Sequence, residues 1–403
     1  MSDRSPVSRR GLLVGGGLAA AAAGAGVGVA GVNVVGARGD ASAPPPLVDF
    51  YGPTQAGIAT GMQAHAVFNA YDLLPETDAE AARRLLTLIT DDSARLTRAE
   101  PALNDQEPYL ATVAARLTVT VGFGPPWFDK LGMSVKRPAG LTELPSYKID
   151  RLQPAFSGGD LILQLCADDL LVLSHAARQL TKTVRGFARL RWSQHGFSRA
   201  AGGHVPHGKD RTSAPRNLMG QIDGTVNPVA GTPDFVAVVW STEPGWFAGG
   251  TTMVLRRIRM ELDRWDELDA IGKELAVGRR LETGAPLTGT LETDAADFGA
   301  TDSSGIPVIP NFAHIARAAP REETDRFLRR PFNYDDSSST VPTDAGLLFC
   351  TFQASIQKQF MPVQQRLAEL DNLNDWTVPI GSAVCALPPG CAPGGFVGEG
   401  LFS

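Results

Sequence analysis

Three side chains in the C-terminal half of the chain have the types that proton transfer and metal binding require. Asp223 lies between glycines in Gly220-Gln221-Ile222-Asp223-Gly224, a loop whose backbone can pass close to a bound ligand. His314 and Arg329 follow further along the chain. A carboxylate can act as a base and then as an acid, an imidazole can bind a metal, and a guanidinium can stabilise a developing negative charge. Taken alone, the Asp223 segment is equally well explained as a simple turn.

A metal-binding histidine needs a hydrogen-bond acceptor on its second ring nitrogen, which fixes the tautomer and raises the basicity of the ring. A helix predicted over residues 362–373 carries two candidates, Asp371 and Glu369. Asp371 is the preferred partner of His314, and Glu369 is the alternative. Either carboxylate could instead be a solvated group near the C-terminal end of a helix.

The composition is that of a globular protein with room for two domains. The 403 residues are 43% hydrophobic and 20% charged, so a sizeable core can be buried. The formal net charge of -6 argues against a nucleic-acid-binding surface. The basic run Arg256-Arg257-Ile258-Arg259 is balanced by nearby carboxylates and is interpreted as a solvated strand face.

The first 43 residues resemble an export signal rather than part of the fold. A twin-arginine pattern, SRRGLL at residues 8–13, precedes an Ala- and Gly-rich run, and Ala41-Ser42-Ala43 is a plausible cleavage site. Twin-arginine export moves proteins that are already folded, often with a cofactor inserted. We therefore predict a signal peptide over residues 1–43 and a secreted or extracytoplasmic mature protein. A membrane anchor and a disordered tail are the alternatives.

Strand and helix patterns alternate in both halves of the mature chain, which predicts an α+β fold. Apolar runs predict strands over residues 117–121, 160–166, 186–192, 235–240, 252–259 and 346–352. Helical spacing predicts helices over residues 170–184, 263–276 and 362–373. A strand directly followed by a helix occurs in both halves, which suggests a duplicated unit. The polar segment 201–215 separates the halves, so we predict domains over residues 44–215 and 216–403.

Some histidines and cysteines carry weaker signals. His204 and His207 lie in the polar segment 201–215, where a mobile loop is favoured over a metal site. Cys385 and Cys391 flank Pro388-Pro389-Gly390, and in an oxidising compartment they could form a disulfide or remain free.

Ten short segments, spread over nearly the whole mature chain, together resemble the dye-decolorizing peroxidase family. They are YGPTQAGI (51–58), GFG (122–124), DLILQLCADD (160–169), WSQHGF (192–197), GQIDG (220–224), GGT (249–251), GR (278–279), GAPL (284–287), IGSA (380–383) and PPG (388–390). A lone glycine–aspartate–glycine motif is a weak signal, but this many matches in order is a strong one. The twin-arginine signal and the long irregular segments are most similar to the exported bacterial branch of the family.

The resemblance implies two ferredoxin-like α+β domains, with heme b held mainly by the C-terminal one. It also implies that His314 is the proximal ligand of the heme iron, for which Asp371 remains the preferred hydrogen-bond partner and Glu369 the alternative. The family has an arginine two residues after this histidine. Here Ala316 stands at that position and Arg317 follows it, so Arg317 is the residue expected to contact the heme.

On the distal face of the heme, the resemblance places Asp223 with the adjacent Gly224. Asp223 would move a proton between the two oxygens of peroxide, and a guanidinium would stabilise the departing oxygen. Arg329 matches the family's distal arginine, and Arg330 is the alternative. An aspartate in this role predicts an acidic pH optimum, because an ordinary aspartate has a pKa of about 4.

The resemblance implies a heme peroxidase that reduces hydrogen peroxide through an oxo-ferryl intermediate and oxidises dyes, phenols or other aromatic donors. Donors too bulky to reach the iron would transfer electrons through surface aromatics. Tyr334, Trp246, Trp265 and Trp376 are candidates, although ordinary packing also explains each of them. The alternative function is that of a deferrochelatase-like protein, which handles heme and releases iron in iron acquisition. A binding protein without heme is a third interpretation.

Overall fold

The N-terminal half is an antiparallel sheet of four strands with two long helices on one face. In the computed structural model, which describes residues 47–198, 216–322, 324–341 and 343–403, its strands are β1 (His65–Leu73), β2 (Thr118–Phe123), β3 (Leu161–Ala167) and β4 (Ala188–Phe197). They lie in the order β2-β3-β1-β4. The helices are α1 (Ala79–Leu96) after β1, the short α2 (Pro125–Lys130) after β2, and α3 (Leu170–Val184) after β3. Apart from α2, the chain order is therefore strand–helix–strand–strand–helix–strand.

The two long helices form where the sequence places caps and apolar side chains at helical spacing. Asp78 and Asp169 accept hydrogen bonds from backbone N–H groups in the first turns of α1 and α3, at 2.8 and 2.9 Å. In α1, the buried Leu85, Leu86 and Ile89 recur at the three- and four-residue spacing of one helix face. That face and the matching face of α3 pack on the sheet, and β2 and β3 are buried along their whole length.

The C-terminal half repeats this arrangement. Its strands are β5 (Thr251–Met260), the short β6 (Leu328–Arg329) and β7 (Phe332–Asp335), β8 (Ala345–Gln353) and β9 (Thr377–Leu387). Strand β8 pairs with β5 on one edge and with β6 and β7 on the other, while β9 pairs with the second edge of β5. With β6 and β7 taken together, this strand order is the same as that of the N-terminal half. The predicted duplication of a ferredoxin-like α+β unit is thus confirmed.

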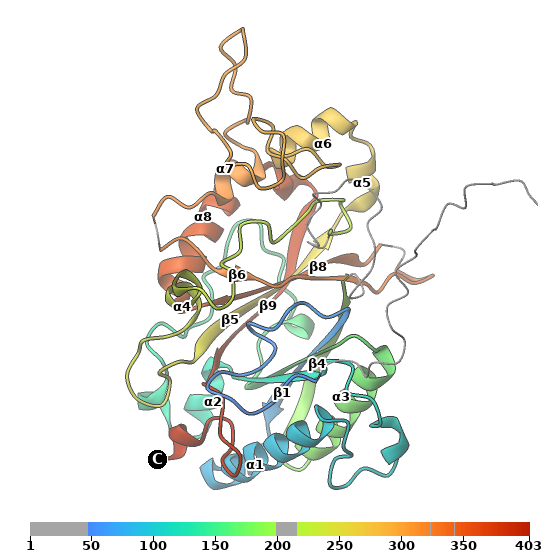
Figure 1. The fold of residues 1–403 in the computed structure, drawn as a ribbon, viewed down its shortest axis with the longest axis vertical. Coiled ribbons are helices and arrows are strands. Elements are labelled where there is room, and N and C mark those ends of the chain that lie inside the picture. Colours follow the sequence, from blue (N-terminus) through green and yellow to red (C-terminus); the bar gives the residue numbers. More distant parts are fainter. Residues whose placement is uncertain (1–46, 199–215, 323, 342) are drawn as a thin grey trace, which may run out of the picture. The chain divides into compact units, whose positions relative to one another are not determined.

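The helices of the C-terminal half are α4 (Pro233–Val239), α5 (Leu262–Asp266), α6 (Ala270–Val277), α7 (His314–Ala318) and α8 (Met361–Leu370). Figure 1 shows α5 to α8 at the top of the molecule and α1 at the bottom, with the strands between them. A long irregular stretch follows α6 and ends directly at the first residue of α7, His314. This stretch and the short helices form the side of the C-terminal half that faces away from the N-terminal helices.

The two sheets join into one nine-stranded sheet that closes on itself. Strand β4 meets β7 at Phe197 and Asn333, and β2 meets β9 at Phe123 and Ala386. The pairing of β5 with β8 completes the ring. A buried apolar cluster with side chains from both halves fills the space between the sheets. The two halves are therefore joined by backbone pairing as well as by a shared core.

All four cysteines are free thiols, so the disulfide considered for Cys385 and Cys391 is not formed. Cys385 lies on β9 within the apolar cluster between the sheets, and burial raises its pKa. Burial, with the nearby Glu399 carboxylate, raises the pKa of Cys391 to about 11. Both side chains therefore remain as unreactive thiols at neutral pH.

One predicted strand is a helix. The residues predicted as a strand, 235–240, lie mostly in α4, whose start is capped by Thr232 through a 3.2 Å hydrogen bond from the backbone N–H of Phe235. Pro233 takes the first helical position, where its missing N–H is not needed. The buried Phe235, Val238 and Val239 share one helix face, but an apolar run this short does not distinguish a helix from a strand.

Two predicted helices have different bounds in the structure. The helix predicted over residues 263–276 is divided into α5 and α6, because Asp269 caps a new helix by accepting from the N–H of Gly272 at 2.7 Å. The helix predicted over residues 362–373 ends at Leu370, and Asp371 is its C-terminal cap. Asp371 therefore lies just beyond the helix, with an extended backbone.

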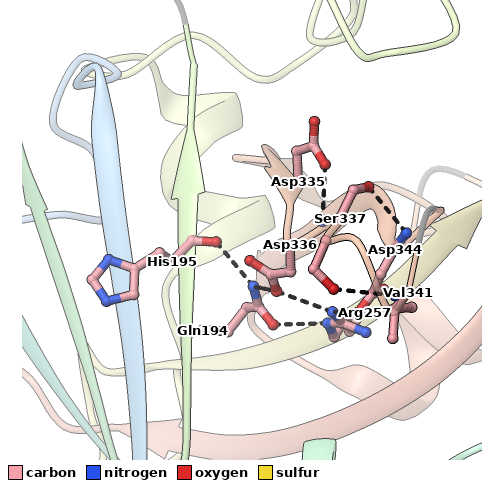
Figure 2. A network of polar contacts seen from close by, with 9 residues as sticks. Gln194, His195, Arg257, Asp335, Asp336, Ser337, Val341 and Asp344 are labelled. Atoms are coloured by element: carbon pink, nitrogen blue, oxygen red, sulfur yellow. Dashed lines mark hydrogen bonds and ion pairs between the residues drawn. The ribbon is translucent and has the colours of Figure 1, made fainter.

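The run Arg256-Arg257-Ile258-Arg259 lies on a strand, as predicted, but its first two arginines are not solvated. Arg256 and Arg257 are only 1% and 4% exposed. Figure 2 shows Arg257 in a polar network, where its Nε donates to Gln194 at 2.7 Å and its Nη2 lies 3.1 and 2.9 Å from the carboxylates of Asp336 and Asp344. These partners come from distant segments, so the local sequence does not reveal that the charge is compensated and buried.

Some predictions concern residues outside the described ranges. These are the signal peptide over residues 1–43, the polar segment 201–215 with its two histidines, and the domain boundary at residue 215. They stay predictions. Across the ranges that the structure does describe, no helix is both long enough and apolar enough to cross a membrane.

Candidate active site

His314 is the first residue of α7, and its imidazole contacts the carboxylate of Asp371. The Nδ1 of His314 lies 2.6 Å from Oδ2 of Asp371, and the other carboxylate oxygen accepts from the backbone N–H of Leu373 at 3.0 Å. The N–H of Asn372 donates to the carbonyl of Phe312 at 2.9 Å, which ties the two segments together. With Nδ1 held by a carboxylate, Nε2 is the ring nitrogen that can bind a metal.

Charges on both sides of His314 act on its pKa. Burial lowers the pKa, but the carboxylates of Asp371 and Asp223 together raise it by more, so the net pKa lies above the ordinary value of 6.5. Asp223 also raises the pKa of His314, and Arg329 lowers it. These two residues, distant in sequence, are therefore close enough in space for their charges to act on the ring.

The alternative partner of His314 lies elsewhere. Glu369 is exposed on α8, and its carboxylate is 3.7 Å from the guanidinium of Arg317. Arg317 also donates to the carbonyl of Arg366 at 3.3 Å, so its side chain runs along α8. This contact packs α7 on α8 and gives no support to the expected contact of Arg317 with heme.

Asp223 and Arg329 form an ion pair in which Nε of Arg329 lies 2.7 Å from Oδ1 of Asp223. About one fifth of each side chain is exposed, at 21% and 22%. Asn227 holds the arginine from its backbone: its Oδ1 accepts from the N–H of Arg329 at 3.0 Å, and its Nδ2 donates to the carbonyl of Arg329 at 2.7 Å. Sequence analysis missed Asn227, and the only local signal is its place in the turn after Asp223.

Gly224 makes the turn that brings Asn227 into this position. Its φ of +103° lies in the left-handed region that favours glycine, and the N–H of Asn227 donates to its carbonyl at 3.0 Å. A Cβ at Gly224 would lie 3.4 Å from Nδ2 of Asn227. The glycine therefore leaves room for the side chain that fixes Arg329.

Arg330, the alternative distal arginine, points towards the N-terminal half. It is 5% exposed, donates to the carbonyl of Thr60 at 2.6 Å, and also donates to the side chain of Gln63. Consecutive residues of an extended segment direct their side chains to opposite sides, so only one of the two arginines can meet Asp223. The structure pairs Arg329 with Asp223.

Two glycines from the sequence motifs hold the segments of the site close together. A Cβ at Gly278 would lie 2.6 Å from a side-chain carbon of Ile315, next to His314. A Cβ at Gly284 would lie 2.8 Å from a side-chain carbon of Ile222, next to Asp223. Both glycines have a positive φ, so other residues at these positions would be strained as well as crowded.

Arg279 is a further cation close to this pair, and sequence analysis assigned no role to it. Burial lowers its pKa, the charge of Arg329 lowers it further, and Glu292 raises it. Its Nη1 donates to the carbonyls of Gly284 and Glu292 at 2.6 and 3.0 Å. Arg279 therefore ties together two points of the irregular stretch after α6 and adds positive charge near Arg329.

The four candidate relay aromatics differ in their surroundings. Trp265 and Trp376 are in edge-to-face contact, with ring centroids 5.4 Å apart. Tyr334 is buried between the sheets, and the guanidinium of Arg257 lies 4.1 Å from its ring centre. Trp246 is partly buried in the N-terminal core. Each contact is also ordinary packing, so the relay role stays a prediction.

Comparison with known proteins assigns this geometry to a family. A model described as "Dyp-type peroxidase, N-terminal" matches residues 55–198, and one described as "Dyp-type peroxidase, C-terminal" matches residues 214–392. The chain belongs to the Dyp-type peroxidase family. It is therefore a heme-dependent peroxidase of the dye-decolorizing type, which uses hydrogen peroxide and an electron donor.

Three relatives of this Dyp-type chain show how far the similarity extends. It is 35% identical to the dye-decolorizing peroxidase of Thermobifida fusca (strain YX), with all of this chain and 98% of that protein covered. It is 34% identical to the deferrochelatase of Yersinia pestis bv. Antiqua (strain Nepal516), with 85% of this chain and 82% of that protein covered. The crystal structure of the DyP-type peroxidase from Cellulomonas bogoriensis is 47% identical, with a TM-score of 0.85, and covers 89% of this chain and 98% of its own.

The side chains gathered around His314 fit the chemistry of a heme. The imidazole offers Nε2 to iron while Nδ1 is held by a buried carboxylate, which is the arrangement that supports metal-bound histidines. About 35% of the His314 side chain is exposed, so the ring is accessible. The Asp223–Arg329 pair supplies the acid–base group and the cation that peroxide chemistry needs.

Proposed function

We propose that this Dyp-type peroxidase binds the heme iron through His314 and handles hydrogen peroxide with Asp223 and Arg329. The observation that carries the proposal is the ion pair of these two residues, whose charges both act on the imidazole of His314. Asp371 would act as a positioning residue for His314. Asn227 would act in the same way for Arg329.

A heme held by His314 would supply the redox-active iron at which peroxide is reduced. The Asp223 carboxylate takes the proton from one peroxide oxygen and delivers it to the other, which then leaves as water. The guanidinium of Arg329 stabilises negative charge on the departing oxygen without giving up a proton of its own. The 2.7 Å contact between the two side chains orients the carboxylate and disperses its charge before peroxide arrives.

An absorption spectrum of the heme-loaded protein, recorded before and after one equivalent of hydrogen peroxide, tests the proposal. We expect a prompt change of the heme spectrum in the wild-type protein and a much slower one in Asp223→Ala and Arg329→Ala. A matched change to Arg330→Ala, which lies outside the pair, should leave the rate closer to that of the wild type. Equal rates in all three variants would contradict the assigned roles.

We also propose that the protein is exported by the twin-arginine route and oxidises a dye, a phenol or a similar aromatic donor outside the cytoplasm. The support is the SRRGLL pattern at residues 8–13 and the similarity to a dye-decolorizing peroxidase over the whole chain. Replacing Arg9 and Arg10 together with lysine should retain the protein in the cytoplasm. Fractionation that still recovers the double variant outside the cytoplasm would count against this route.

The 34% identity to a deferrochelatase favours one second candidate, the release of iron from heme with the porphyrin left intact. The heme-loaded protein would be incubated with a reductant and a ferrous chelator. Appearance of the chelated iron with an equal amount of metal-free porphyrin fluorescence would support iron release. Retention of iron together with rapid peroxide consumption would support the peroxidase alone.

A further inference from the structure

A cavity of about 510 Å³ lies in the N-terminal half, and none of its lining residues belongs to the candidate active site. It is formed by the end of β1, the start of α2, the turn before β3 and the start of β4. A volume of this size is within the range of about 300–1,000 Å³ that is usual for small-molecule sites. The residues that line it determine what chemistry such a ligand needs.

The cavity is lined by apolar side chains and by glycine backbone as well as by charged groups. Leu74, Pro75 and Pro126 are its apolar wall, and Gly158 and Gly159 add backbone. The carbonyl of Gly158 accepts from the indole nitrogen of Trp192 at 2.9 Å, which fixes this glycine against the core. Apolar lining with a few polar groups is the usual composition of a small-molecule site, and an aromatic ring suits the apolar part.

Four of the six charged side chains that line the cavity are neutralised in pairs. Lys130 lies 2.6 Å from Asp160, which is 1% exposed and also accepts from a backbone N–H of β1. Arg191 lies 3.2 Å from Asp72 and donates to a backbone carbonyl at 2.7 Å. These pairs fix the walls and leave little net charge of their own.

The two remaining charges are Arg189 and Glu143. Arg189 lines the cavity from β4 and has no ion-pair partner among the residues that the structure describes. Burial raises the pKa of Glu143, while Arg191 opposes the rise. The other charged residues that line the cavity are Arg189, Arg191, Lys130, Asp72 and Asp160. Because its pKa is raised, Glu143 becomes neutral at a higher pH than an ordinary glutamate. Mildly acidic solution then leaves the guanidinium of Arg189 as the uncompensated charge.

We propose that this cavity binds an aromatic carboxylate, with the ring against Leu74, Pro75 and Pro126 and the carboxylate on the guanidinium of Arg189. A planar guanidinium matches a planar carboxylate with two parallel hydrogen bonds. The apolar wall supplies the contact area that orients the ring. The inference concerns binding in the N-terminal half and is independent of the proposed peroxide chemistry.

Isothermal titration calorimetry of the heme-loaded protein with 2-naphthoate tests the proposal, with the neutral 2-naphthamide as the matched ligand. We expect the carboxylate to bind and the amide to bind at least threefold more weakly. Arg189→Gln should weaken naphthoate binding by about fivefold, the upper range for one solvent-exposed charge pair. Glu143→Gln should strengthen it by about twofold, because a competing charge is removed.

Arg84→Gln is the control, since Arg84 is an exposed arginine on α1 outside the cavity. Its affinity for naphthoate should equal that of the wild type. Three results would each overturn the proposal: no binding of naphthoate to the wild type, equal binding of the amide, or equal affinities of Arg189→Gln and Arg84→Gln. Equal affinities of the two variants are also what binding of naphthoate near the heme, and not in this cavity, would produce.

Discussion

Replacing Asp371 with asparagine isolates the charge on the partner of His314. Asparagine has nearly the same shape, and its amide oxygen can still accept from the backbone N–H of Leu373, which Asp371 accepts at 3.0 Å. The change therefore removes the anion beside Nδ1 and keeps the turn after α8. The heme-loaded Asp371→Asn variant should hold its heme less tightly than the wild type.

The size of the effect follows from the geometry. The contact is short, at 2.6 Å, and the Asp371 side chain is only 5% exposed, so solvent screens it little. Loss of such a partner typically costs 10–100-fold in metal affinity. For a short and buried contact we expect the upper part of this range, roughly 100-fold or about 2.8 kcal/mol.

Heme transfer to an excess of apomyoglobin, followed by the Soret band, measures the loss. The reduction potential of the bound heme gives a second readout, and it should rise in Asp371→Asn because a less basic imidazole stabilises ferric iron less. Glu369→Gln is the matched control, since Glu369 is exposed and lies beside Arg317. Wild-type heme retention in Asp371→Asn, or an equal loss in Glu369→Gln, would refute the assignment.

Three further predictions follow from the same contacts. Arg257→Met should lower the free energy of unfolding by about 3 kcal/mol, because it breaks a buried ion pair. Arg259→Met, on the partly exposed end of the strand, should lower it by less than about 1 kcal/mol. Equal urea denaturation curves for the two variants would contradict this prediction. Arg329→Lys keeps the charge but loses the planar fork, so stopped-flow rates with hydrogen peroxide should fall about 100-fold, and an unchanged rate would argue against the fork. In protein prepared without heme, the raised pKa of His314 contributes stability that is complete below pH 6.5 and is lost as the pH rises through the raised pKa. The urea midpoint of the wild type should therefore fall with rising pH in this range, and that of Asp371→Asn should not. Identical pH dependence of the two midpoints would contradict the prediction.

The sequence predicted the parts of the fold that local patterns determine. The helix over residues 170–184 and the strands around residues 160–166 and 346–352 form as expected, because caps and apolar periodicity act over a few residues. The strand and helix patterns suggest a duplicated unit, but its ferredoxin-like topology and the heme are predicted only by the resemblance to a family. The apolar run in α4 was read as a strand, because six residues are too few to separate the two periods.

Contacts between distant segments were harder to predict. The partner of His314 was expected to be Asp371, and the structure brings these two together across 57 positions of the chain. No local sequence pattern indicates that the side chain of Asn227 hydrogen-bonds to the backbone of Arg329. The burial of Arg257 was missed for the same reason, since its carboxylate partners lie on a loop far along the chain.

The closed sheet has a consequence for the order of events during synthesis. Strand β9 pairs with β5 and also meets β2, and it follows every other strand along the chain. A nascent chain therefore leaves the edges of both strands exposed until residue 387 has emerged from the ribosome, and exposed edges are sites of mispairing between chains. The closed sheet is therefore completed only by the last strand, and we expect protection of the open strand edges during synthesis to limit mispairing between chains.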